Sequence, residues 1–298
     1  MGRAPPFAIA SLLAAVLIAG CASRTAAPSS SSTQPGAAAT PATASSASSL
    51  PPSTAANTSA PVAAHVAPCP VPALDYAGTP YSPQAAPATT NVPALPAGAQ
   101  VFGTVFVPGS LSYLLGPASA TCQAAFASAD GGESMVVTSV ADRSAGVTMV
   151  IRAGGVGPST DLACPYIPAV YAADKAFRQG QTFCGHPSAD VIRQIPTGTA
   201  SLYAAAVLVP AGVKDPNLHG SGGTDPTVAL YTAQVSQNAA NGQLVACTLA
   251  SAEGNVCAAS LKFFLATQAY ISTKLSAASL STMEAALASF LDPQEDVR

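Results

Sequence analysis

Segment 184–190 gathers more chemically reactive residue types than any other part of this 298-residue chain, namely Cys184, His186, Ser188 and Asp190. A cysteine thiolate beside an oriented imidazole is a nucleophile for acyl transfer, and a serine beside a histidine is its hydroxyl counterpart. Two positions of separation do not by themselves bring Ser188 and His186 within hydrogen-bond reach. The chain also lacks the G-x-S-x-G motif of a serine nucleophile. Catalysis by this segment therefore depends first on whether Cys184 is a free thiol.

A second candidate is the glycine- and proline-rich stretch 210–226, which contains Lys214, Asp215, His219 and Asp225. Connections of this length between two strands are often functional. A histidine between two aspartates could bind a ligand or a metal ion, and the alternative is a solvated loop tip. No pair of histidines has metal-binding helical spacing, and no calcium-loop pattern occurs. We therefore predict a possible ligand loop, no metal site and no cofactor.

Charge is scarce along the whole chain. Eleven Lys and Arg residues and 14 Asp and Glu residues give a net charge of -3, and charged residues make up 8% of the sequence. Ordinary globular domains contain about 25%. The basic residues are scattered, so no basic stripe exists to neutralise a row of phosphates. The composition therefore argues against nucleic acid as a partner.

The N-terminus has the layout of a secretory signal. Residues 7–20 are apolar or small, and Arg3 precedes them. The alternative is an uncleaved membrane anchor, but the run is shorter than the about 18 to 20 residues that span a bilayer. Residues 18–21 (Ile-Ala-Gly-Cys) resemble the lipobox of bacterial lipoproteins. This resemblance implies that Cys21 becomes the mature N-terminus and carries a lipid, which holds the protein on the extracytoplasmic face of the cell membrane.

Six cysteines remain once Cys21 is set aside for the lipid. An even number in an oxidising compartment predicts three disulfides. Local pairing favours Cys164–Cys184 and Cys247–Cys257, which leaves Cys69–Cys122. The alternative interpretation is that the cysteines bind zinc, but no two of them show the C-x₂₋₄-C spacing of a zinc site. Pairing of Cys184 would remove the best nucleophile in the chain.

Composition divides the chain into three parts. Residues 1–20 are the signal peptide, and residues 21–66 are the lipidated cysteine and a tether of mainly Ala, Ser, Thr and Pro, which we expect to be disordered. The tether is either a stalk that lifts the domain from the membrane, with sugars on its hydroxyls, or a plain spacer. Residues 67–298 are expected to form a single folded extracytoplasmic domain.

Within that domain, many short β-type runs separated by Gly and Pro predict a mostly antiparallel, sandwich-like sheet. The runs are 101–107, 122–129, 134–140, 147–152, 191–195, 202–209, 228–235 and 243–249, and an Asp-Gly step at 130–131 marks a hairpin.

Helical spacing appears near the C-terminus and between Cys164 and Cys184, where Val170, Ala173 and Phe177 share a face. Residues 281–284 form a capping box, which predicts the start of the last helix. The predicted class is therefore α+β, with C-terminal helices packed on a disulfide-stapled sheet.

Three functions remain open. The favoured one is a surface-exposed lipoprotein whose non-catalytic domain binds a component of the cell envelope. The second is a carrier of an apolar, lipid-like ligand, which needs an apolar cavity. The third is an envelope hydrolase, which needs His186 or His219 in a cleft beside a suitable nucleophile or carboxylate.

Overall fold

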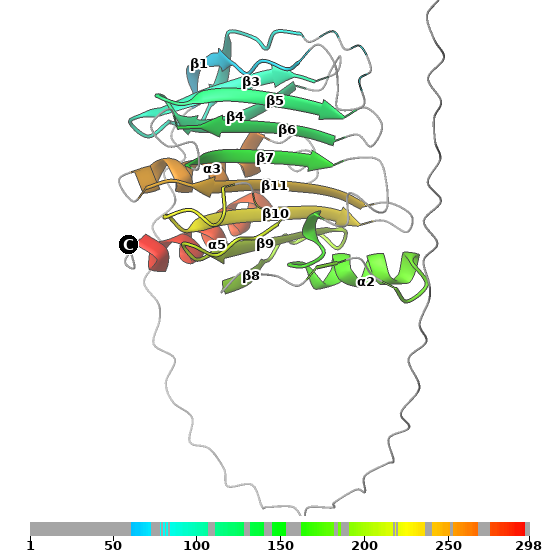
Figure 1. Cartoon of the computed structure of the whole chain (residues 1–298). Coiled ribbons are helices and arrows are strands. Elements are labelled where there is room, and N and C mark those ends of the chain that lie inside the picture. The colour runs from blue at the N-terminus through cyan, green and yellow to red at the C-terminus, as the bar shows by residue number, and fades with distance from the viewer. Residues whose placement is uncertain are drawn as a thin grey trace, which may run out of the picture. The chain divides into compact units, whose positions relative to one another are not determined.

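An antiparallel sheet is the central layer of the fold (Figure 1). Within the described part of the chain it has seven strands, in the order β5-β6-β7-β11-β10-β9-β8. Their bounds are β5 Thr121–Ala127, β6 Gly132–Thr138, β7 Gly146–Arg152, β8 Val191–Ile195, β9 Leu202–Val209, β10 Thr227–Val235 and β11 Ala240–Thr248. Both the mostly antiparallel sheet and the hairpin between β5 and β6 were expected from the sequence, and both are confirmed.

The computed structural model describes residues 61–72, 78, 80, 82, 84–106, 111–127, 132–139, 145–152, 162–181, 184–185, 191–216, 218, 220–235, 240–250, 253–267 and 275–295. These residues all belong to one compact unit, Ala56–Arg298. Cys21, His186 and His219 lie outside the described residues.

A second sheet has the order β2-β1-β3-β4, with bounds β1 Val62–Pro68, β2 Thr89–Val92, β3 Ala99–Val105 and β4 Leu111–Pro117. Strand β1 pairs in parallel with β3, whereas its pairing with β2 is antiparallel. The expected tether included residues 62–66, so its end was placed too late. This segment is ordered because Val66 packs against the apolar residues of β3, a long-range contact that local composition does not reveal.

Three described helices accompany the sheets: α2 (Pro168–Phe177), α3 (Gly254–Thr267) and α5 (Ala277–Glu295). Helix α2 contacts β10, α3 contacts β4, β10 and β11, and α5 contacts α3 and β8. None of the helices that the structure describes has both the length and the apolarity needed to cross a membrane.

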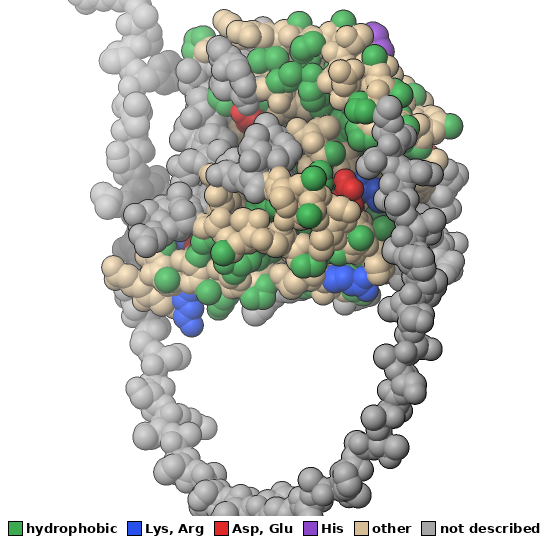
Figure 2. Space-filling view, turned by 180° about the vertical axis from the view of Figure 1, so that it is seen from behind, with side chains coloured by type: hydrophobic (Ala, Val, Ile, Leu, Met, Phe, Trp, Pro, Cys, Tyr) green, Lys and Arg blue, Asp and Glu red, His purple; other side chains and the backbone are tan. Residues whose placement is uncertain are grey.

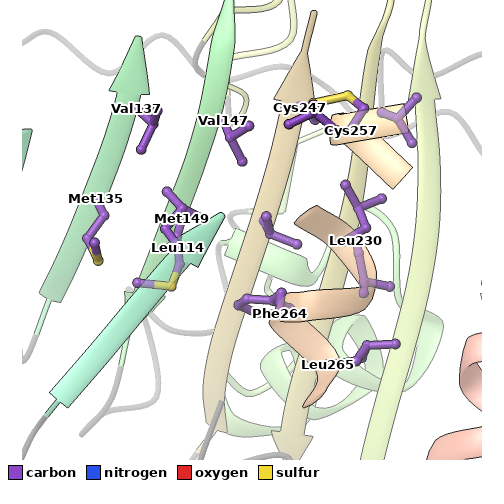
Figure 3. Packing of buried hydrophobic residues seen from close by; sticks show 14 of the residues in the cluster. Leu114, Met135, Val137, Val147, Met149, Leu230, Cys247, Cys257, Phe264 and Leu265 are labelled. Atoms are coloured by element: carbon purple, nitrogen blue, oxygen red, sulfur yellow. A yellow bond between two sulfur atoms is a disulfide. The ribbon is translucent and has the colours of Figure 1, made fainter. Parts of the chain in front are cut away.

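The central strands are buried along almost their whole length. In β10, residues 227–233 are buried without a break. Apolar layers cover both faces of these strands, so their sequences read as continuous apolar runs rather than alternating ones. One layer includes Met135, Leu230 and Val245 from the sheet with Phe264 and Leu265 from α3 (Figure 3). The other contains Tyr166, Val170 and Tyr231.

Two expectations about the helices need correction. The capping box at 281–284 lies inside α5, and the helix begins one turn earlier, where the Ser276 hydroxyl accepts a hydrogen bond from the Ser279 N–H at 3.1 Å. In α2, Val170 is buried as expected, but Phe177 is 57% exposed. Phe177 is the last residue of α2, and only the first two turns of this helix bury side chains.

The three disulfides Cys69–Cys122, Cys164–Cys184 and Cys247–Cys257 are present, and these are the pairs that local pairing favoured. Cys69–Cys122 connects the end of the small sheet to β5, and Cys247–Cys257 connects β11 to the first turn of α3. Cys164–Cys184 joins the segments that precede and follow α2.

Candidate functional site

The reactive segment 184–190 loses its thiol in the folded chain. Cys184 is bonded to Cys164, so it has no thiolate to offer as a nucleophile. Its sulfur lies 3.8 Å from the carboxylate of Asp174, a fully buried residue of α2 that forms an ion pair with Arg178 at 2.7 Å. The disulfide is therefore part of the packing of α2.

The stretch 210–226 places its candidate residues in different environments. Asp215 is 1% exposed and accepts a hydrogen bond from the Tyr166 hydroxyl. Lys214 is exposed, and the partly exposed Asp225 accepts a hydrogen bond from its neighbour Thr224. Asp215 is thus an internal structural group rather than an open ligand site.

The Ser221 hydroxyl holds the turn around Asp215. It lies 2.8 Å from the Leu218 carbonyl oxygen, and it accepts a hydrogen bond from the Asp215 N–H at 2.9 Å. A buried hydroxyl that forms hydrogen bonds with several backbone groups can satisfy them where the backbone forms no regular secondary structure. The described part of this stretch is therefore folded back on itself.

Tyr166 stacks on Tyr231, with ring centroids 4.4 Å apart. The Tyr231 hydroxyl is buried and has no hydrogen-bond partner among the described residues. Burial is the largest cause that raises the pKa of Tyr231 well above its usual value, followed by the neighbouring Tyr166 hydroxyl and then by Asp215. These three residues form a buried internal cluster, since each is at most 2% exposed.

An open groove lies elsewhere, between α3 and the connection from β2 to β3, and its volume is about 240 Å³. Residues 93–96 form one wall. The other lining residues are Leu115 of β4, four residues of α3 (Ala259, Lys262, Phe263 and Ala266) and Glu284 of α5. Mostly apolar walls with a few polar groups are typical of binding sites for small molecules.

Helix α3 lines this groove with a second apolar stripe. Ala259, Lys262, Phe263 and Ala266 are spaced i, i+3, i+4 and i+7, which places them on one side of the helix. The core-facing stripe has the same spacing and consists of Cys257, Ser260, Leu261 and Phe264. The helix is therefore mostly apolar on two sides: the side packed in the core includes the polar Ser260, and the side facing the groove includes the charged Lys262.

A buried hydroxyl fixes the position of α3 against the small sheet. The Ser260 hydroxyl lies 2.8 Å from the Leu115 carbonyl oxygen of β4 and 2.7 Å from the Val256 carbonyl oxygen of its own helix. Phe263 packs with Leu115 and Val101 at the base of the groove. The groove is thus built on regular elements rather than on loops alone.

Lys262 and Glu284 are the charged residues that line the groove. Among the ion pairs between described residues, none joins Lys262 to Glu284. Burial raises the pKa of the half-buried Glu284 above its ordinary value, although the ammonium of Lys262 acts in the opposite direction. Among the described residues on the face shown in Figure 2, charged side chains are also sparse.

The sequence did not indicate the groove, because its residues come from four separate segments and none belongs to a motif for catalysis or ligand binding. The apolar residue Phe263, adjacent to the core residue Phe264, was the available signal. No family model matches the chain, and no relative is found among curated proteins. The proposal for its function therefore comes from the geometry.

Proposed function

We propose that this protein is a lipid-anchored, extracytoplasmic binding protein, and that the groove beside α3 holds an apolar ligand or the apolar part of an envelope component. The observation that carries the proposal is the groove itself, an opening of about 240 Å³ with apolar walls and two charged groups. Leu115 of β4, four residues of α3 and Glu284 of α5 belong to regular elements, so most of the site is preformed and little ordering is required on binding.

The volume favours a small apolar molecule over a protein partner. A stable protein interface needs about 800 Å² from each partner, which one groove of this size does not supply. An engineered cavity of about 150 Å³ is large enough to hold benzene. The groove is larger than that cavity, and an acyl chain or small ring system matches it best.

The hydrolase hypothesis has lost its principal residue, since Cys184 is in a disulfide. The export part of the proposal is supported by the resemblance of residues 18–21 to a lipobox and by the three disulfides, because disulfides persist in oxidising compartments.

Mass spectrometry of the mature protein from cells tests the anchor. We expect a chain that begins at Cys21 and carries the mass of a lipid on this residue. A mature chain without that mass would overturn the lipid-anchor proposal.

A fluorescent apolar probe tests binding by the chain from residue 21 onward, with Cys21→Ser to prevent lipidation; this chain keeps the whole unit Ala56–Arg298. We expect the probe to bind with one-to-one stoichiometry, and Ala266→Phe to abolish binding by filling the groove. The matched control is Ala172→Phe on the exposed side of α2, which should leave binding unchanged. Binding that is equal to that of the unsubstituted chain in both Ala266→Phe and Ala94→Phe, a second substitution on the opposite wall, would contradict the assignment of the groove.

A further inference from the structure

We propose that the groove selects an amphiphile of about ten apolar carbon atoms whose head group is polar but carries no net charge. This inference rests on the proposed function of the groove and goes further by naming the ligand class. It excludes fatty-acid anions and alkylammonium ions as the preferred ligands.

The size of the apolar part follows from the volume. Scaling from benzene in a cavity of about 150 Å³, the groove volume of about 240 Å³ corresponds to about ten carbon atoms. Phe263 and Leu115, which are 4% and 1% exposed, form an apolar base on which these carbons would pack.

The nature of the head group follows from the two charged residues. An ammonium offers only hydrogen-bond donors, and an ionised carboxylate offers only acceptors. A head group that meets both Lys262 and Glu284 must therefore accept from one and donate to the other. A hydroxyl or an amide does both.

Charge complementarity excludes a net charge on the ligand. An anionic head is attracted by Lys262 and repelled by Glu284, whereas a cationic head experiences the reverse. The two Coulomb contributions oppose each other, but the cost of removing a full charge from water remains. A neutral head pays a smaller desolvation cost and still satisfies both side chains.

Three probes of equal chain length test the inference at about pH 7.5, where an alkanoate is ionised and an alkylamine is protonated. These are decanol, decanoate and decylamine, which are added to the Cys21→Ser chain from residue 21. Decanol is kept below its solubility limit, and the two charged probes are kept below their micelle concentrations. Displacement of the fluorescent apolar probe reports their affinities. For the unsubstituted groove we expect decanol to bind about fivefold or more tightly than either charged probe.

Single substitutions should switch this preference in opposite directions. Glu284→Gln leaves Lys262 as the charge in the groove, and it should make decanoate the tightest ligand. Lys262→Gln leaves Glu284, and it should make decylamine the tightest. The matched control is Lys175→Gln, an exposed lysine of α2, which should leave the order of the three probes unchanged.

The possible failures are distinguishable. If none of the three probes binds, or if neither Ala266→Phe nor Ala94→Phe on the opposite wall blocks binding, the groove is not the site and the proposed function fails. If binding is blocked by either plug but a charged probe binds most tightly to the unsubstituted groove, the site stands and the head-group inference is overturned. If both Gln variants still bind decanol most tightly, the head-group inference is also overturned.

Discussion

Two stacked tyrosines provide a matched test of the buried cluster, because the same change should have opposite effects at the two positions. In Tyr231→Phe the stacked ring stays and a hydroxyl without a partner is removed. In Tyr166→Phe the ring also stays, but the hydrogen bond to the carboxylate of Asp215 is lost. The pair therefore separates hydrogen bonding from aromatic packing.

The magnitudes follow from the partners of each hydroxyl. Burial of an unsatisfied hydroxyl costs about 1 to 3 kcal/mol, so Tyr231→Phe should raise the free energy of unfolding by about 1 to 2 kcal/mol. A hydrogen bond to a charged group is worth about 1.5 to 3 kcal/mol, so Tyr166→Phe should lower it by that amount. For a unit of this size, each kcal/mol shifts Tm by about 2 to 4 °C.

The effect of pH on the Tyr231 variant has a defined sign. Burial raises the pKa of Tyr231 in the folded chain, whereas the unfolded chain ionises near its ordinary value of about 10. Above that pH the unfolded chain loses its proton first, so the free energy of unfolding falls as pH rises. Tyr231→Phe removes this component, and its advantage over the unsubstituted chain should widen in alkali.

Urea unfolding of the oxidised chain at about pH 7 and above pH 10 measures both effects. A loss of about 1 kcal/mol or more in Tyr231→Phe would refute the reasoning, because it would mean that the hydroxyl has a partner. Equal losses in the two variants would assign the effect to ring packing instead.

Three further perturbations test other parts of the fold. Gly146→Ala places a Cβ against the backbone carbonyl oxygen of Val137 in β6 and should cost about 3 kcal/mol in urea unfolding. Gly185→Ala, with no atom within 4 Å of the added Cβ, should cost almost nothing. Replacing Cys164 and Cys184 together by Ala opens a loop with a sequence separation of 20 and should lower the free energy of unfolding by about 3 kcal/mol relative to the oxidised unsubstituted chain. Under reducing conditions this difference between the double variant and the unsubstituted chain should disappear. Glu284→Gln should flatten the dependence of Tm on pH above 4.5: burial raises the pKa of Glu284, so the folded chain holds the proton longer than the unfolded chain and loses stability as pH rises. A pH profile identical to that of the unsubstituted chain would show that Glu284 is not desolvated.

Local sequence was sufficient for strands that are rich in β-type residues and bounded by turn-forming residues. The bounds of β8 and β9 match the expected runs 191–195 and 202–209, because strand-type residues there are bounded by Gly or Pro. Strands β1 and β2 were missed, since their segments are rich in Ala, Pro and Thr, and they exist through pairing with partners far along the chain. Strand β4 was missed because its residues show no alternation: its last four are all buried, between β3 and α3.

The groove could not be predicted from local sequence either, because it also depends on contacts between distant segments. Its walls combine the connection 93–96, β4, α3 and α5, and their juxtaposition is a property of the folded chain. The sequence instead predicted a ligand loop in the glycine-rich stretch 210–226, because this stretch is long and polar. The buried carboxylate of this stretch, Asp215, accepts a hydrogen bond from the Tyr166 hydroxyl inside the fold. Residue type alone does not distinguish an internal acid from one that faces a ligand.

Helix α3 joins the disulfide-linked core to the candidate binding groove. A disulfide from Cys257 links it to β11, and one turn later the Ser260 hydroxyl donates a hydrogen bond to the Leu115 carbonyl oxygen of β4. A helix fixed by two such bonds on its core side cannot rotate without breaking one of them, so its opposite stripe stays directed at the groove. Binding of an apolar ligand to this stripe then requires no rearrangement of the core, and selectivity rests on the two charged side chains that line the groove.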